Sequence, residues 1–179
     1  MSKIMIEKSI KKNQIYHGSA VDFFCDEVEL LNGATAKREY VHHPGASAII
    51  PFIDKNSIVL VKQYRYPVNQ ITYEIPAGKI DKNETPLECI TRELEEETGY
   101  KSKRLEKLLA FYPTTAFSNE IIHIFAAFGL KEGKQNPDED EFVSKEIISF
   151  KEAVEMVKKG KIMDSKTIIA LLYFDSILK

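Results

Sequence analysis

A cluster of glutamates between residues 84 and 97 has the residue type and the spacing to bind a metal ion. Glu93, Glu96 and Glu97 recur at the i, i+3 and i+4 spacing that, at ~100° per residue, places side chains in one sector of a helix. Like charges so spaced destabilise an isolated helix, and a bound cation would offset that cost. Carboxylate oxygens are ligands that Mg²⁺ and Mn²⁺ prefer. The spacing therefore predicts a divalent metal site, with a solvated acidic helix face as the alternative.

The residues around these carboxylates carry the signals that begin and end a helix. Thr85 is a suitable N-cap, Pro86 suits the first helical position, and Glu88 completes a capping box. Gly99 supplies the stop, so we predict a helix from about Pro86 to about Thr98. The apolar stripe of this helix consists of Leu87, Ile90 and Leu94. The predicted helix thus carries the three carboxylates along the rim of its buried face.

The whole segment from residue 78 to residue 100 resembles the signature of the Nudix hydrolases, which is called the Nudix box, or the box, below. That signature is a glycine, five residues, a glutamate, seven residues, an arginine and a glutamate, an aliphatic residue, any residue, two glutamates, any residue, a glycine and a hydrophobic residue. Its positions are filled here by Gly78, Glu84, Arg92, Glu93, Leu94, Glu96, Glu97, Gly99 and Tyr100. Because so many fixed positions match within one window, the chain is identified as a member of this family. The resemblance implies hydrolysis of a diphosphate linked to another moiety.

The family resemblance also implies roles for individual residues. Glu93 and Glu97 are expected to be the main ligands of Mg²⁺ or Mn²⁺, with Glu96 supporting them and the carbonyl of Ala77 adding an oxygen. Arg92 is expected to serve catalysis by orienting a glutamate; its spacing lets it reach Glu96. A glutamate held by a metal is a poor proton acceptor, so the general base is expected outside this segment.

The acidic segment Pro137-Asp138-Glu139-Asp140-Glu141 is the expected source of the base. By composition alone it is equally compatible with a solvated acidic loop. The chain resembles the ADP-ribose pyrophosphatase branch of the family, in which a loop before a late strand carries paired glutamates. The resemblance implies that Glu139 and Glu141 complete the catalytic site, with Glu139 favoured as base and Glu141 as ligand. Glu120 is the alternative base.

The resemblance to this branch covers most of the chain, including residues 38–46, 61–67 and 73–78. It implies that Arg38 and Arg65 contact the substrate as positive groups facing phosphate or base. The alternative is that both are surface arginines at strand ends. The branch also implies an N-terminal strand domain exchanged between two subunits, and hence a homodimer.

Thr115 marks a departure, because the enzymes of this branch typically carry a proline at that place in the loop beyond the box. Without proline the loop lacks a rigid turn. The expected substrate is therefore ADP-ribose or a related nucleoside diphosphate sugar, cleaved to AMP and a sugar phosphate. The alternatives are a pyrophosphatase for another nucleoside diphosphate derivative and a non-catalytic Nudix-fold ligand sensor. Such sensors tend to lose box carboxylates or to gain a DNA-binding appendage, and this sequence shows neither.

The composition of the chain indicates which binding partners and which cell compartment to expect. The net charge is −2 without a long basic run, so we expect no nucleic-acid partner. No stretch approaches the ~20 apolar residues of a membrane span, and charges interrupt the first residues in a way that signal peptides do not show. Cys25 and Cys89 are far apart and form no metal motif, which fits a reducing cytosol. We expect a cytoplasmic protein without a membrane partner.

The chain is long enough for one domain and an appendage, and 44% hydrophobic residues suffice for a core. We predict an α+β protein, a Nudix α/β/α sandwich with a mixed sheet over residues 44–179, plus a small antiparallel strand subdomain over residues 1–43. Such a small meander buries too little to be stable alone, so we expect it to be a dimerisation element. The predicted strands are 15–16, 21–28, 36–41, a hairpin of 46–52 with 58–64, then 105–112, 121–130 and 142–150. The predicted C-terminal amphipathic helices are 151–159 and 163–178.

Overall fold

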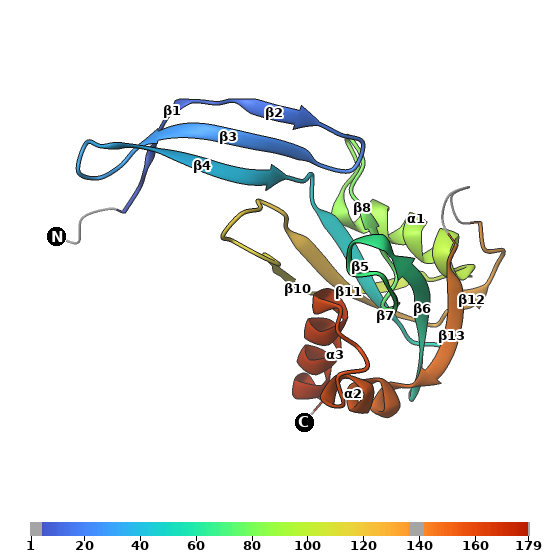
Figure 1. Cartoon of the computed structure of the whole chain (residues 1–179). Helices are drawn as coiled ribbons and strands as arrows, with labels where there is room; N and C mark the ends of the chain where they lie inside the picture. The colour runs from blue at the N-terminus through green and yellow to red at the C-terminus, as the bar shows by residue number, and fades with distance from the viewer. Residues whose placement is uncertain (1–4, 137–141, 179) are drawn as a thin grey trace. The chain divides into compact units, whose positions relative to one another are not determined.

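The protein forms two compact units in the computed structural model, which describes residues 5–136 and 142–178 (Figure 1). The first unit comprises residues 1–44 and 112–120, and the second comprises residues 45–111 and 121–179. The segment 112–120 was expected to belong with the second unit. It joins the first because the Val41 N–H donates to the Phe117 carbonyl at 2.8 Å and the Asn119 N–H donates to the Val41 carbonyl at 3.4 Å.

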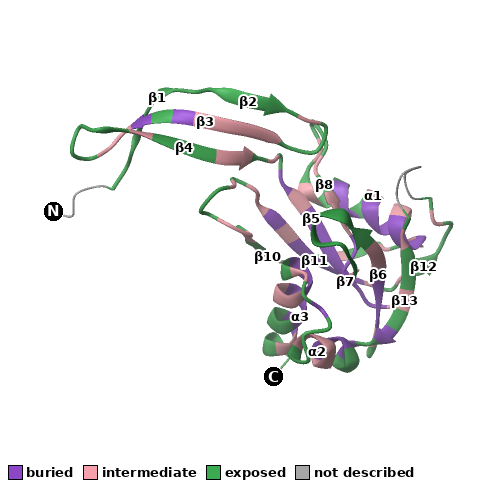
Figure 2. Ribbon diagram, viewed as in Figure 1, coloured by how far each residue is buried: buried purple, intermediate pink, exposed green. Residues whose placement is uncertain are grey.

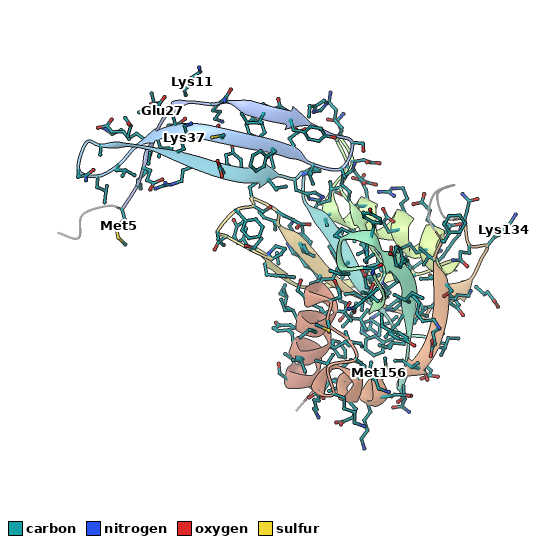
Figure 3. All side chains as sticks on the ribbon, in the orientation of Figure 1. Met5, Lys11, Glu27, Lys37, Lys134 and Met156 are labelled. Atoms are coloured by element: carbon teal, nitrogen blue, oxygen red, sulfur yellow. The ribbon has the colours of Figure 1, made fainter. Side chains whose placement is uncertain are left out.

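β3 (Asp22–Glu29) is the central strand of the first unit and pairs antiparallel with β1 (Lys8–Lys11), β2 (Gln14–His17) and β4 (Thr35–His42). Three of these strands match the predicted ones, whereas the charged β1 was not predicted. The register places Glu27 between Lys11 and Lys37, all three labelled in Figure 3. Opposite charges on neighbouring strands favour this register over a slipped one.

The second unit contains two main sheets. The first has the order β10 (Arg104–Phe111), β11 (Ile122–Phe128), β5 (Ala46–Pro51) and β8 (Ala77–Lys79). The second is antiparallel, with the order β13 (Ser144–Ser149), β6 (Ser57–Arg65) and β7 (Gln70–Glu74). A 3-10 turn, η1 (Tyr66–Val68), joins β6 to β7, and β9 (Tyr100–Lys101) pairs with β12 (Lys131–Glu132). Because β11 runs parallel to β5 and antiparallel to β10, the predicted mixed sheet is confirmed.

The predicted hairpin of residues 46–52 and 58–64 is wrong, although both strands and the turn between them exist. The Asp54 carboxylate closes the turn by accepting from the N–H groups of Asn56 and Ser57, each at 2.8 Å. Beyond the single bridge of Phe52 with Ile58, the two strands enter different sheets. Both edges of β5 are taken by β11 and β8, so none remains for β6.

Helices cover the two faces of the β5–β11 pair. α1 (Pro86–Thr98) packs Ile90 and Leu94 against Ile49 and Phe125 on one face. The neighbouring residues of the same strands point to the other face, towards α2 (Phe150–Lys158) and α3 (Ser165–Ile177). Figure 2 shows these central strands as mostly buried. The layers are those of the predicted α/β/α arrangement.

α3 departs from the amphipathic pattern predicted for it. Its outer side keeps Leu172, Tyr173 and Ile177 exposed, so the apolar residues of this helix do not all face the core. Among the described residues, no helix has the length and apolar character needed to cross a membrane.

Candidate active site on helix α1

α1 begins and ends where the sequence predicts. The Thr85 side chain accepts from the Glu88 N–H, the Glu88 carboxylate accepts from the Thr85 N–H, and Gly99 ends the helix in the left-handed region at φ 73°. A Cβ on Gly99 would lie 2.8 Å from the backbone nitrogen of Gln135, so glycine also permits the close approach of that chain segment. The ends of α1 are thus fixed by local chemistry.

Two contacts tie α1 to the strands beside it. The Ser47 hydroxyl donates to the Pro86 carbonyl at 2.9 Å, and the Cys89 thiol contacts the Gly78 and Lys79 carbonyls at 3.5 and 3.4 Å. Burial raises the pKa of the Cys89 thiol to about 12. This thiol therefore stays protonated at neutral pH and serves packing, since the thiolate is the nucleophilic form.

Arg92 is the centre of an ion-pair cluster that joins three box glutamates. Its Nε and Nη2 donate to the two Glu84 oxygens at 3.0 Å each, and its Nη1 donates to Glu93 Oε1 at 2.6 Å and to Glu96 Oε2 at 2.9 Å. The hydrogen bond with Glu84 is the main cause that raises the pKa of Arg92 and lowers that of Glu84. Arg92 and Glu84 are therefore charged at neutral pH, and the single guanidinium contacts three carboxylates.

Glu93 and Glu97 are both buried. A buried carboxylate is energetically costly unless a counter-charge or hydrogen bonds compensate it. Glu93 occupies the space in front of Gly78, because a Cβ built there would lie 1.7 Å from Glu93 Oε1. Glu97 is 2% exposed, and its Oε2 accepts from the Ala77 N–H at 3.0 Å. The β8 backbone and α1 together therefore form a cradle for these two side chains.

The donor chemistry of this cradle fits a hard divalent cation, since the glutamates on α1 offer oxygen ligands. Among the described residues, no three His, Cys, Asp or Glu side chains converge as a ready metal cluster. Arg92 engages one oxygen each of Glu93 and Glu96, and Glu97 accepts from Ala77. Glu93, Glu96, Glu97 and the Ala77 carbonyl are the groups that would hold the ion.

A second ion-pair cluster, not predicted from the sequence, surrounds Glu74 at the end of β7. Arg65 donates its Nε and Nη2 to the two Glu74 oxygens at 2.8 and 2.7 Å. Lys166 also donates to Glu74, and its Nζ lies 3.0 Å from Asp164 Oδ1. Burial would raise the pKa of Glu74, but the contacts with Arg65, Lys166 and Thr72 outweigh it and lower the pKa to about 2. Glu74 is therefore ionised although it is only 1% exposed.

The start of α3 fixes the lysine of this second cluster. Asp164 is the N-cap and accepts from the Thr167 N–H at 3.0 Å, while the Thr167 hydroxyl accepts from the Ile75 N–H at 2.9 Å. The one local signal in the sequence is a capping aspartate two residues before a lysine. Their partner Glu74 lies 92 residues away from Lys166, beyond the range of any local pattern.

Two further predicted site residues, Arg38 and Arg65, form ion pairs with other partners. Arg38 is on β4 in the first unit, where its Nε donates to Glu7 Oε2 at 2.8 Å. Arg65 belongs to the Glu74 cluster. Glu139 and Glu141 lie outside the described residues.

The chain belongs to the NUDIX domain family, whose model matches residues 41–172. It is 47% identical over 175 residues to a methanol dehydrogenase activator of Bacillus methanolicus, covering 97% of this chain and 95% of that protein. It is 44% identical over 173 residues to an ADP-ribose pyrophosphatase of Bacillus subtilis (strain 168), covering 96% and 94%.

More distant proteins agree on the family and the fold. A GDP-mannose pyrophosphatase of Yersinia enterocolitica is 36% identical over 138 residues, with 72% of each chain covered. The crystal structure of an ADP compounds hydrolase superposes with a TM-score of 0.87 at 19% identity, covering 99% of this chain and 97% of that one. This structural likeness confirms the predicted fold class.

Proposed function

We propose that the protein is a Nudix pyrophosphatase that hydrolyses the diphosphate of ADP-ribose, or of a related nucleoside diphosphate sugar, to AMP and a sugar phosphate. The observation that carries the proposal is the complete box on α1, with Glu93 and Glu97 buried beside β8 and joined to it through Gly78 and Ala77. The 44% identity to an ADP-ribose pyrophosphatase supports the choice of substrate.

In this proposal Glu93, Glu96, Glu97 and the Ala77 carbonyl hold Mg²⁺ or Mn²⁺. Such an ion neutralises diphosphate charge and lowers the pKa of a bound water. Arg92 keeps the glutamates oriented through its contacts, at 2.6 Å to Glu93 and 2.9 Å to Glu96. Water attacks one phosphorus and the bridging P–O bond breaks, so each product leaves with one phosphate.

The general base is proposed to come from Glu139 or Glu141. The residues just before their segment are bonded to the last turn of α1: the Asn136 N–H donates to the Glu96 backbone carbonyl at 3.0 Å, and the Gln135 side-chain amide donates to the Glu97 backbone carbonyl at 2.7 Å. The same Gln135 amide contacts the Val143 carbonyl at 3.4 Å, beyond the acidic segment. The described residues next to the acidic segment are thus bonded to the end of α1, which supports a role of this segment in catalysis.

Arg38 and Arg65 are proposed to contact the substrate, because guanidinium groups suit phosphate recognition. We also propose a cytoplasmic homodimer assembled through the first unit. Its sheet leaves Ile10, Ile15 and Tyr16 exposed, more apolar side chains than an isolated sheet of this size favours. Light scattering at micromolar concentration should give about twice the 20.5 kDa chain mass. A strictly monomeric folded protein would exclude the dimer.

The experiment that tests the proposed reaction is a substrate panel with phosphate detection. ADP-ribose, GDP-mannose and other nucleoside diphosphate sugars are incubated with Mg²⁺ or Mn²⁺, and their products are treated with a phosphatase before the assay. Nucleoside triphosphates are incubated in the same way without the phosphatase, and released pyrophosphate is measured. We expect release from the diphosphate sugars, fastest with ADP-ribose, and none with EDTA. Preferential cleavage of a triphosphate would contradict the substrate class, and no cleavage at all would favour a ligand sensor.

A second candidate function is action on a partner enzyme, favoured by the 47% identity to a methanol dehydrogenase activator. Adding the protein to a methanol dehydrogenase tests this candidate directly. If wild type stimulates alcohol oxidation and Glu97→Gln does not, stimulation depends on hydrolysis. Equal stimulation by both would make the two activities separate.

A further inference from the structure

The cluster around Glu74 is a buried carboxylate held from two sides. From the solvent side, the Arg65 guanidinium binds both Glu74 oxygens, and the Arg65 side chain is 43% exposed. From the protein side, Lys166 binds one of the same oxygens, and its side chain is only 10% exposed. The cluster therefore has an accessible cation and an inaccessible one, linked through a single carboxylate.

Arg65 has a donor edge that the cluster does not use. Its Nε and Nη2 are bonded to Glu74, while Nη1 has no hydrogen-bond partner among residues 5–136 and 142–178. The side chain borders a pocket of about 550 Å³. Glu74 and Asp164 line the same pocket. Because Arg65 lines this pocket and its side chain is 43% exposed, a ligand bound here would lie beside the guanidinium.

We propose that Lys166 is a positioning residue for the reaction: through Glu74 it holds Arg65 in place, so that the outer edge of the guanidinium binds a phosphate group of the substrate. The inference rests on the proposed function for the nature of that substrate. Lys166 acts indirectly in this proposal, because the lysine itself is buried and does not contact the ligand.

The charges explain why a second cation is needed. Arg65 alone would face Glu74 and the nearby Asp164, and an anionic ligand would meet a pocket with an excess of negative charge. Lys166 lies between these two carboxylates, bonded to Glu74 and 3.0 Å from Asp164. Electrostatic interactions are strong where water is excluded, so the buried lysine offsets the negative charge of the two carboxylates. The positive charge of Arg65 is then available to attract an anionic ligand in the pocket.

A purely structural role for Lys166 makes a different prediction. Lys166 also ties α3 to β7, alongside the bond from the Ile75 N–H to the Thr167 hydroxyl. If this tie were the whole role of Lys166, its loss would lower the stability of the protein. The contribution of Arg65 to phosphate binding would then stay the same with or without Lys166. Coupling between Lys166 and Arg65 in ligand binding therefore separates the two explanations.

The test is a double-mutant cycle on the affinity for inorganic pyrophosphate, measured by calorimetry with the full chain in saturating Mg²⁺. We expect Arg65→Ala to weaken binding by about tenfold or more, and Lys166→Met to weaken it by about tenfold. In the Arg65→Ala background, Lys166→Met should change the affinity by less than about twofold. Lys166→Gln, which keeps a donor but not the charge, should behave as Lys166→Met and serves if the methionine variant does not fold.

Lys62→Met is the matched control, because Lys62 lies on the same strand as Arg65 and forms an ion pair with Glu146 at 2.9 Å. It should leave the pyrophosphate affinity unchanged. The inference is overturned if Lys166→Met weakens binding equally in both Arg65 backgrounds, if it has no effect, or if wild type does not bind pyrophosphate. Hydrolysis of ADP-ribose by wild type is measured separately, so failure of the proposed substrate would be seen independently of this outcome.

Discussion

The two ion-pair clusters of the second unit differ in the balance of their charges. Around Arg92, one cation contacts Glu84, Glu93 and Glu96, and Glu97 lies one turn beyond Glu93 on the same helix. Around Glu74, Arg65 and Lys166 face Glu74 and Asp164, so cations and carboxylates are equal in number. Both clusters contain buried carboxylates, but the ion pairs of the first join one cation to three carboxylates, whereas those of the second join two cations to two carboxylates.

This difference separates the proposed metal site from the network that positions Arg65. Buried charges are costly unless they are paired. The Glu74 cluster meets that requirement with two cations, whereas in the α1 cluster Arg92 contacts three carboxylates, an arrangement that a bound divalent cation would complement. We therefore expect changes in the α1 cluster to act mainly on catalysis, and changes at Glu74 to act on stability and on substrate affinity.

The largest expected effect comes from removing one charge of the unbalanced cluster. Glu97→Gln should lower turnover of ADP-ribose by about a thousandfold at saturating Mg²⁺, because a proposed metal ligand is lost while the side-chain shape is kept. Steady-state kinetics and a thermal melt measure activity and folding together. Glu95→Gln is the control on the same helix, since Glu95 pairs with Lys101 at 2.7 Å and not with Arg92. Near-wild-type activity of the Glu97 variant would exclude its role as a metal ligand.

The acidic segment with Glu139 and Glu141 should supply the general base for the reaction. At least one of Glu139→Gln and Glu141→Gln should slow single-turnover hydrolysis by about a hundredfold, with Glu139 favoured as base. Loss of the base should leave metal affinity nearly unchanged, whereas loss of a ligand should weaken it. Glu132→Gln, on the exposed strand β12, is the control. Unchanged rates in both variants would direct the search for the base to Glu120.

The cluster of Glu74, Arg65 and Lys166 should make the stability of the protein depend on pH. The pKa of Glu74 is about 2 in the folded protein, below the ordinary value of 4.5. Its ionised form therefore stabilises the fold above pH 4.5, and this contribution disappears as the pH falls from 4.5 towards 2. Because Arg65 is partly exposed, we expect a loss of about 2 kcal/mol rather than the full shift. Urea unfolding should show that Glu74→Gln lacks this part of the acid loss; parallel pH profiles would contradict the prediction.

The smallest expected effect tests the cradle without removing any charge. Gly78→Ala should lower activity by about tenfold, because the new Cβ would displace the Glu93 carboxylate from a position 1.7 Å away. Gly160→Ala is the contrasting control, because a Cβ at Gly160 would meet open space while the backbone has a φ of 68°. This variant should lower stability by about 1 kcal/mol and leave the activity unchanged. Equal activities of the two variants would mean that Glu93 does not need its position in front of Gly78.

The sequence predicts best those features that depend on neighbouring residues. The bounds of α1 follow from Thr85, Pro86 and Gly99, whose capping and turn chemistry acts within one turn. The contact of Arg92 with Glu96 follows from helical spacing. These local signals also carry the family signature, which is why the fold class was predicted correctly.

Features that depend on distant partners were missed. β5 was expected to pair with β6 because the two are adjacent in sequence, yet β11 takes its edge from more than seventy residues further along the chain. The Glu74 cluster likewise joins β7 to the start of α3. No pattern within one strand or helix encodes such a pairing, since it is decided by tertiary packing.

The central claim, that the unbalanced charge on α1 binds a divalent cation, is tested most directly by titrating the metal-free protein with Mn²⁺ and measuring free Mn²⁺ by electron paramagnetic resonance. Wild type and Glu74→Gln, the control from the balanced cluster, should bind Mn²⁺ with similar affinity. Glu97→Gln should bind it at least about tenfold more weakly. Equal Mn²⁺ affinity in all three proteins would contradict the assignment of the metal site to α1.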